Sequence, residues 1–159
     1  MRMMKISILG AGAWGTALAI QAARAGHEVC LWARDAAAVA QMQASRRNAA
    51  YLPDSELPPS LGLTADRAGA IAHAADGLTI VATPMSGLRE TLAALPSTHR
   101  VLWLCKGFEA VTGRLGWDGQ ATNTTTLGSN AVTVTWRPDL AGSSLLTGLL
   151  STALGDVPA

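Results

Sequence analysis

One feature constrains the fold more than any other, a glycine-rich segment with the sequence GAGAWG at residues 10–15. It follows a short apolar run, Lys5–Leu9, and it opens a segment of helical character. A glycine-rich turn between a strand and a helix is typical of a dinucleotide-binding site. We expect Gly10 to allow a sharp turn, Gly12 to let backbone approach a pyrophosphate, and Gly15 to let the helix pack on the strand. The first amides of that helix would then face the phosphates.

Strands and helices are predicted to alternate through the rest of the first hundred residues. The expected strands are Lys5–Leu9, Glu28–Ala33, Leu61–Thr64, Leu78–Ala82 and Val101–Cys105, and the expected helices are Trp14–Ala25, Ala36–Arg46, 66–74 and Ser86–Leu95. A proline-rich stretch, Asn48–Ser60, is predicted to be a loop. This alternation favours an α/β fold, a Rossmann-like doubly wound parallel sheet with right-handed crossovers.

Composition narrows the class of protein. The chain has 159 residues, which is enough for one domain with a hydrophobic core and short for two. It is 14% charged with a net charge of +1, so it has no basic cluster that would indicate a nucleic-acid or anionic-membrane partner. No apolar run reaches membrane-spanning length, and the N-terminus is a poor signal peptide. We therefore expect a cytoplasmic protein.

The cysteines and histidines are not predicted to carry chemistry. Cys30 and Cys105 each fall in a predicted buried strand, which favours inert core thiols and a reducing compartment. His27, His73 and His99 are interpreted as solvated residues at the boundaries of elements. Their spacing does not match that of metal ligands, so no metal site is expected.

The carboxyl ends of the predicted strands define a crevice in which such sheets bind ligands. Five segments should meet there: the glycine turn, Ala33–Asp35, Thr83–Met85, Lys106–Phe108 and the loop around Tyr51. Because the carboxyl ends of parallel strands share one edge of the sheet, this convergence follows from the topology alone.

Arg34, Asp35 and Lys106 are the charged candidates in this crevice. An arginine after the second strand can pair with a 2′-phosphate, whereas an acidic residue there binds both ribose hydroxyls, so Arg34 favours NADP over NAD. A solvated charge at Arg34 and a simple helix cap at Asp35 remain alternatives. Lys106 could hold a phosphate or carboxylate or polarise a carbonyl, or it could be a surface lysine.

Several of these segments resemble the cofactor-binding half of bacterial NAD(P)-dependent glycerol-3-phosphate dehydrogenases. The similar segments are Gly10–Ala19, Leu31–Asp35, Asn48–Pro53, Val81–Pro84 and Cys105–Glu109, within a resemblance over residues 4–115. The resemblance implies hydride exchange between nicotinamide and C2 of sn-glycerol 3-phosphate or dihydroxyacetone phosphate, for the supply of glycerophospholipid precursors. With the glycine turn, it gives ten candidate cofactor-binding residues: Gly10, Gly12, Ala13, Trp14, Gly15, Arg34, Asp35, Tyr51, Pro84 and Lys106. Lys106 would also bind substrate.

The sequence changes character after residue 115. Residues 116–159 contain eight threonines, against seven in the first 115 residues, and no lysine follows Lys106. The family continues with a helical domain that carries an acid–base lysine, so we expect that catalytic domain to be absent here. Residues 1–115 would form the NAD(P)-binding domain, and 116–159 would be an atypical tail, truncated or frameshifted, and poorly ordered or loosely packed. Alternatively the tail completes the sheet, because 131–136 alternates like a strand.

Two classes of function follow from the resemblance. The first is an enzyme by family, a glycerol-3-phosphate dehydrogenase, of which this isolated chain would have little or no activity and no assigned catalytic residue. The second is a non-catalytic NAD(P)-binding module or fragment, and a different dehydrogenase on the same half-fold is a third. Expected partners are the nicotinamide dinucleotide and the phosphorylated substrate, and association into homo-oligomers stays open.

Overall fold

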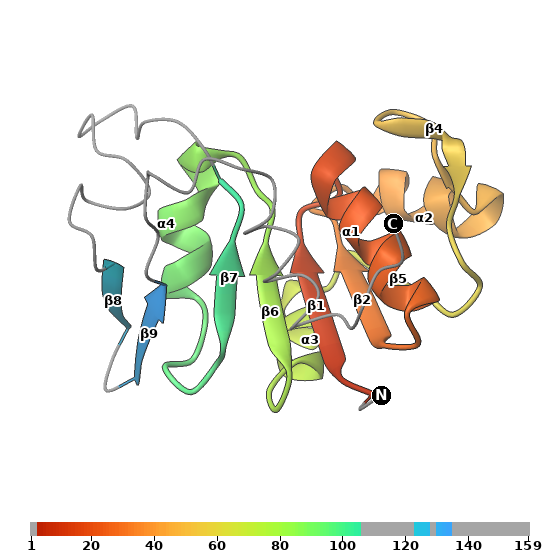
Figure 1. Cartoon of the computed structure of the whole chain (residues 1–159). Helices are drawn as coiled ribbons and strands as arrows, with labels where there is room; N and C mark the ends of the chain where they lie inside the picture. Colours follow the sequence, from red (N-terminus) through yellow and green to blue (C-terminus); the bar gives the residue numbers. More distant parts are fainter. Residues whose placement is uncertain (1–2, 106–122, 128–129, 135–159) are drawn as a thin grey trace, which may run out of the picture.

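A parallel sheet forms the centre of the molecule. The computed structural model describes residues 3–105, 123–127 and 130–134. The five strands are β1 (Lys5–Leu9), β2 (Glu28–Trp32), β5 (Gly62–Thr64), β6 (Leu78–Val81) and β7 (Val101–Trp103). They lie side by side in the order β5-β2-β1-β6-β7, and every pair is parallel (Figure 1). The predicted α/β fold class is confirmed.

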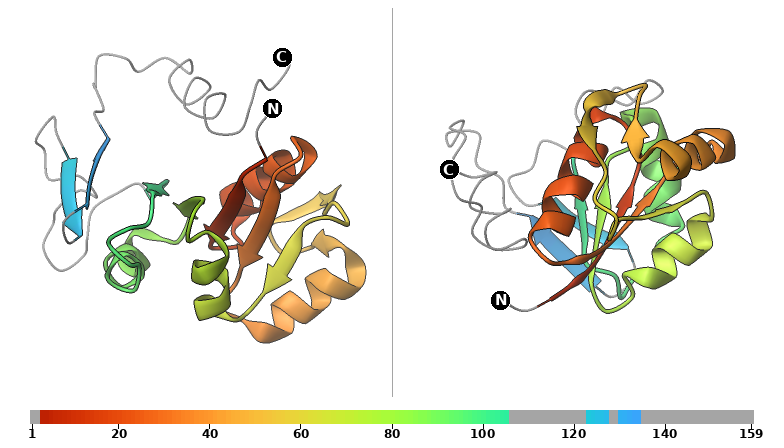
Figure 2. Two further views of the ribbon diagram at one scale, coloured as in Figure 1. Left: turned by 90° about the horizontal axis from the view of Figure 1, so that it is seen from below. Right: turned by 90° about the vertical axis from the view of Figure 1, so that its right-hand side faces the viewer.

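Helices cover both faces of this sheet because each strand alternates its side chains between two cores. The helices are α1 (Ala13–Arg24), α2 (Ala36–Ser45), α3 (Arg67–His73) and α4 (Met85–Ala93). Ile6 and Ile8 of β1 belong to the core beneath α1 and α2. Leu9 belongs to the other core, with Ala70 of α3 and Leu88 of α4. Figure 2 shows α1 on one side of the sheet, with α3 and α4 on the other.

Helix boundaries follow local signals in the sequence. Asp35 caps α2, because its Oδ1 accepts from the amides of Ala37 at 2.8 Å and Ala38 at 3.2 Å. Asp66 caps α3 in the same way, accepting from the amide of Ala68 at 3.0 Å. Gly26, with φ +85°, takes the left-handed conformation that ends many helices.

The stretch Asn48–Ser60 is not the loop that its prolines predicted. It begins with an antiparallel pair, β3 (Arg47–Asn48) and β4 (Leu52–Glu56). A two-stranded pair leaves one edge of each strand free, so Pro53 is tolerated in β4. Arg46, at φ +51°, precedes the pair, and its guanidinium donates to the carbonyl oxygens of Leu57, Pro58 and Leu61.

Two of the three histidines are buried, contrary to the interpretation of all three as solvated. His27 and His99 are each only 5% exposed. The amide of Met4 donates to Nδ1 of His27 at 3.3 Å, and Nδ1 of His99 lies 3.4 Å from the Thr79 hydroxyl. Both histidines lie just before a strand, at the amino end of the sheet. A residue at the boundary of an element in the sequence can therefore be buried in the folded protein.

Both cysteines are free thiols, as expected. Cys105 is buried and Cys30 is half-buried. Burial raises the pKa of each thiol above its ordinary value, and the carboxylate of Asp66 raises the pKa of Cys30 further. A raised pKa keeps a thiol protonated and unreactive near neutral pH, which fits the expected inert role.

A separate antiparallel hairpin, β8 (Asn123–Leu127) with β9 (Asn130–Val134), lies in the later part of the sequence. The alternation at 131–136 predicted a strand there, and β9 covers the first four of those residues. The other expectations for residues 116–159 fall outside the described residues. Within the described ranges, no helix is long and apolar enough to cross a membrane.

Candidate functional site

The glycine turn after β1 is shaped by close backbone contacts. Gly10 has φ +123°, and a Cβ there would lie 2.7 Å from the carbonyl oxygen of Ala82, so only glycine fits. A Cβ on Gly15 would lie 1.9 Å from the carbonyl oxygen of Gly10 and 3.2 Å from Cβ of Ala82. The expected turn at Gly10 is confirmed. Gly15 allows close packing too, but on the turn itself and on the residue after β6.

Gly12 differs from the other two glycines because space, rather than protein, surrounds it. Apart from the adjoining stretch of chain, no atom lies within 4 Å of the position that its Cβ would take. Gly12 is the N-cap of α1, with extended backbone and no side chain capping the first amides. The amide of Thr16 is the first to bond back, to the Gly12 carbonyl at 2.9 Å. The earlier amides of α1 therefore remain available to an anionic group.

Backbone hydrogen bonds join this turn to the ends of neighbouring strands. The amide of Gly10 donates to the Trp32 carbonyl at 3.0 Å. The amide of Ala82 donates to the Leu9 carbonyl at 2.9 Å, and that of Ala33 to the Thr64 carbonyl at 3.1 Å. The glycine turn and the segments that follow β2 and β6 therefore meet at the carboxyl edge, as the topology required. Lys106–Phe108, the fourth expected segment, lies outside the described residues.

Asn48 of β3 brings the Tyr51 segment to the same edge. Its Nδ2 donates to the Ala11 carbonyl at 2.9 Å and to the Thr16 hydroxyl at 2.8 Å, and the side chain is buried. Tyr51 follows in the β3–β4 connection, where its amide donates to the Asn48 carbonyl, and the residue is 60% exposed. Asn48 was not among the site residues predicted from the sequence. Its only signal was its place at the start of a segment already singled out.

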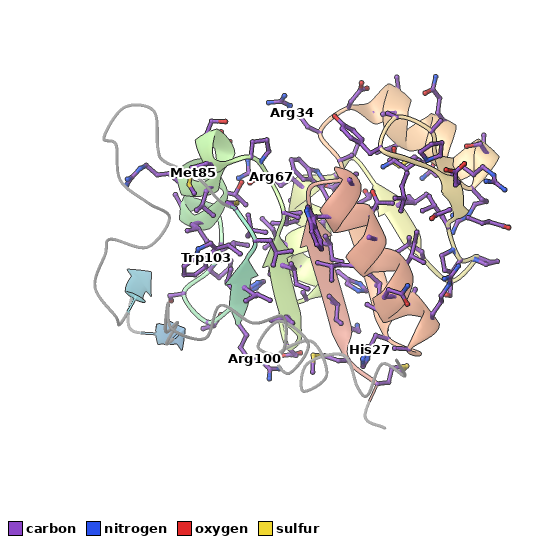
Figure 3. All side chains as sticks on the ribbon, turned by 45° about the horizontal axis from the view of Figure 1, so that its top comes forward. His27, Arg34, Arg67, Met85, Arg100 and Trp103 are labelled. Atoms are coloured by element: carbon purple, nitrogen blue, oxygen red, sulfur yellow. The ribbon has the colours of Figure 1, made fainter. Side chains whose placement is uncertain are left out.

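Arg34 and Asp35 follow β2 at this edge, and both are exposed. Arg34 projects away from the body of the protein (Figure 3), and it has no partner among the described residues. One carboxylate oxygen of Asp35 is engaged by the amides at the start of α2. His27 and Arg100 lie at the opposite edge in the same view.

Two further candidates border the site. Trp14, in the first turn of α1, is 63% exposed. Pro84 is exposed and forms the N-cap of α4, directly after the segment that contacts Gly10. Lys5 opens β1 and so stands at the far end of that strand, away from the glycine turn, as expected. The described residues include no group of three histidine, cysteine or acidic side chains placed to hold a metal.

Arg67 is a second residue that the sequence argument missed. Its guanidinium carbon lies 5.8 Å from the centre of the Trp32 ring, and its Nη1 lies 2.8 Å from Oε1 of Glu90. The Trp32 indole donates to the Ala65 carbonyl at 3.0 Å. Arg67 thus links α3 and α4 beneath the carboxyl end of β2. Partners 23 or more residues apart leave no local pattern to detect.

The strand order, the crossovers and the glycine turn together define a Rossmann-type α/β domain. A family model described as the N-terminus of NAD-dependent glycerol-3-phosphate dehydrogenase matches residues 5–141. The chain therefore belongs to the glycerol-3-phosphate dehydrogenase family, whose members are NAD(P)-dependent oxidoreductases.

Curated relatives also match this chain. A glycerol-3-phosphate dehydrogenase [NAD(P)+] from Methylibium petroleiphilum is 60% identical over 116 residues, which is 71% of this chain and 34% of the relative. One from Leptothrix cholodnii is 53% identical over 124 residues, 71% of this chain and 36% of the relative. The chain thus spans about a third of the length of these relatives.

Solved structures agree on the fold. The glycerol-3-phosphate dehydrogenase of Coxiella burnetii has a TM-score of 0.62 and 27% identity, covering 98% of this chain and 39% of that one. The glycerol-3-phosphate dehydrogenase of Plasmodium falciparum has a TM-score of 0.60 and 28% identity, and the match covers 71% of this chain and 35% of the Plasmodium chain.

Proposed function

We propose that residues 1–115 form the NAD(P)-binding domain of a glycerol-3-phosphate dehydrogenase, with residues 116–159 as a separate segment. The nicotinamide would exchange a hydride with C2 of sn-glycerol 3-phosphate or dihydroxyacetone phosphate. Family membership supports this reaction, because the relatives that match the chain carry that name.

The observation that carries the proposal is the open space at Gly12. A pyrophosphate needs close approach to backbone and a set of unbonded amides, and the uncapped start of α1 offers both. Among the three glycines of the turn, Gly10 and Gly15 are packed against protein, and Gly12 is the one with open space at its Cβ position. The residues present therefore fit a dinucleotide, and Ala13 and Trp14 would border the phosphates from the first turn of α1.

Tyr51, Pro84 and Lys106 would complete the site. The hydrogen bonds of Asn48 support Tyr51 as a neighbour of the glycine turn. Pro84 follows the backbone that contacts Gly10, which supports a role beside the cofactor. Lys106 follows the strand that ends the sheet on this side, and as a cation it suits both the cofactor and a phosphorylated substrate.

Arg34 favours NADP over NAD. Its guanidinium is exposed at the end of β2 and has no partner in residues 3–105, so it is available to a 2′-phosphate. One carboxylate oxygen of the neighbouring Asp35 already accepts hydrogen bonds from the first amides of α2. Asp35 is therefore less available to accept from the ribose hydroxyls, the interaction that would favour NAD.

Titration of the purified chain with NADPH and with NADH tests the proposal. Arg34→Ala should weaken NADPH binding by about 10- to 150-fold, since a charge-assisted contact is worth about 1.5–3 kcal/mol, and leave NADH binding within about twofold. Arg24→Ala is the matched control, because Arg24 is exposed at the other end of α1. Equal weakening of both cofactors by Arg34→Ala would refute the NADP assignment, and no binding of either would refute the domain assignment.

A non-catalytic NAD(P)-binding module is the second candidate, because the open start of α1 at Gly12 supports cofactor binding and does not by itself supply a hydride-transfer step. Oxidation of NADPH by dihydroxyacetone phosphate separates the two. Saturable binding without turnover favours the module, whereas turnover by the purified chain favours the enzyme.

A further inference from the structure

Asn48 makes an unusual set of contacts for a residue in a short edge strand. Its side chain is 4% exposed, and Nδ2 reaches the Ala11 carbonyl at 2.9 Å and the Thr16 hydroxyl at 2.8 Å. These partners lie 37 and 32 residues away in the sequence, on either side of Gly12. One amide group therefore connects β3 to the glycine turn and to the helix that follows it.

The chemistry of the partners fixes the orientation of this amide. The Ala11 carbonyl can only accept a hydrogen bond, so the NH₂ group of Asn48 must face it. The second hydrogen of the same NH₂ group serves Thr16, whose side chain is fully buried. Loss of Asn48 would remove the hydrogen bonds to one part-buried acceptor, the Ala11 carbonyl, and one buried acceptor, the Thr16 hydroxyl. The residues on both sides of Gly12 would then lose the described side-chain hydrogen bonds that join them to β3.

We propose that Asn48 is a positioning residue that holds the open backbone at Gly12 in the shape needed to receive a pyrophosphate. The inference rests on the proposed function. Asn48 does not touch the ligand; it acts through Ala11 and Thr16. The amide of Tyr51 bonds to the Asn48 carbonyl at 3.3 Å, so the same residue sets the position of the Tyr51 turn relative to the glycine turn.

A purely structural role would give a different result, and Ser7 supplies the comparison. Ser7 is fully buried in β1, and its hydroxyl donates to the Ala70 carbonyl at 2.6 Å, 63 residues away. Ser7→Ala also removes a long-range buried hydrogen bond, but on the face of the sheet covered by α3. It should lower the melting temperature without changing the glycine turn.

The experiment compares three ligands on the wild-type chain, Asn48→Ala and Ser7→Ala. NADPH and ADP-ribose contain a pyrophosphate, whereas 2′-AMP does not. We expect Asn48→Ala to weaken NADPH and ADP-ribose about tenfold, the effect of one or two buried hydrogen bonds, and to leave 2′-AMP unchanged. Ser7→Ala should leave all three affinities unchanged. Amide hydrogen exchange at Thr16, whose amide donates to the Gly12 carbonyl, should quicken in Asn48→Ala only.

The outcomes are distinct from those that test the proposed function. If the wild-type chain binds neither NADPH nor NADH, the proposed function fails and this inference falls with it. If the wild type binds NADPH and Asn48→Ala binds it equally well, only the positioning role is overturned. Equal loss of 2′-AMP and NADPH would also overturn it. Should Asn48→Ala fail to fold, Thr16→Val decides, because it keeps the volume and removes one acceptor; it should weaken ADP-ribose but not 2′-AMP.

Discussion

Alanine at Gly15 and at Gly12 should separate folding from binding within one turn of α1. At Gly15 the new Cβ would lie 1.9 Å from the Gly10 carbonyl oxygen, whereas ordinary contact begins at 3.4 Å. Backbone must therefore move by about 1.5 Å, and overpacking of this kind costs about 1–3 kcal/mol, with the backbone clash favouring the upper end. Alanine recovers about 1 kcal/mol of helix propensity. The net loss of about 2 kcal/mol should lower the melting temperature by about 4–8 °C for a chain of 159 residues.

Gly12→Ala should leave the fold almost unchanged. Its φ of −73° is accessible to alanine, and no atom lies within 4 Å of the new Cβ. Alanine is a poorer N-cap than glycine by about 0.5–1 kcal/mol, but it restricts the unfolded chain by a similar amount. The added methyl group instead occupies the space proposed for the pyrophosphate. NADPH affinity should fall at least about tenfold, or about 1.4 kcal/mol.

Thermal unfolding by circular dichroism and NADPH titration measure the two effects on the same samples. We expect opposite results: Gly15→Ala loses stability, and Gly12→Ala loses affinity at wild-type stability. An unchanged melting temperature for Gly15→Ala would refute the steric argument. Wild-type NADPH affinity in Gly12→Ala would refute the placement of the phosphate.

Three other substitutions test the core, an ion pair and a thiol. Ile8→Ala, at a fully buried position of the central strand, should lower the free energy of unfolding in urea by about 2–5 kcal/mol. Glu90→Ala should cost less than about 1 kcal/mol in the same assay, because the Glu90 side chain that pairs with Arg67 is 79% exposed. Burial raises the pKa of Cys105 above its unfolded value, so the thiol stabilises the fold at neutral pH and this contribution disappears as the pH rises through the raised pKa. Melting temperatures between about pH 7 and pH 10 should therefore fall less in Cys105→Ala than in the wild type.

The central sheet could be predicted because its signals are local. Apolar runs such as Leu78–Val81, the glycine turn and the caps at Asp35 and Asp66 each act within a few residues. Once the strands are parallel, topology brings their carboxyl ends together without further information. The convergence of the glycine turn with the ends of β2 and β6 followed in this way.

The features that escaped prediction depend on distant partners. Asn48 is buried by contacts 32 and 37 residues away, and Arg67 pairs with Glu90 across 23 residues. His99 reads as a polar boundary residue until Thr79 and the amino end of the sheet cover it. The prolines led to the prediction of a loop in place of β4, because proline is excluded from central strands but is tolerated in edge strands. Residue type and local spacing do not predict contacts between residues so far apart in the sequence.

The three carbonyl bonds of Arg46 have a consequence for limited proteolysis. A protease must pull a stretch of chain into extended form before it cuts, and exposed connections between helices and strands usually allow this. The connection from α2 to β5 is long and carries the trypsin sites Arg46 and Arg47. Yet β3 and β4 pair within this connection, and the guanidinium of Arg46 donates hydrogen bonds to the carbonyls of Leu57 and Leu61 in its second half. Trypsin should therefore cut this connection slowly, and the segment that bears Tyr51 should remain in the protected core fragment.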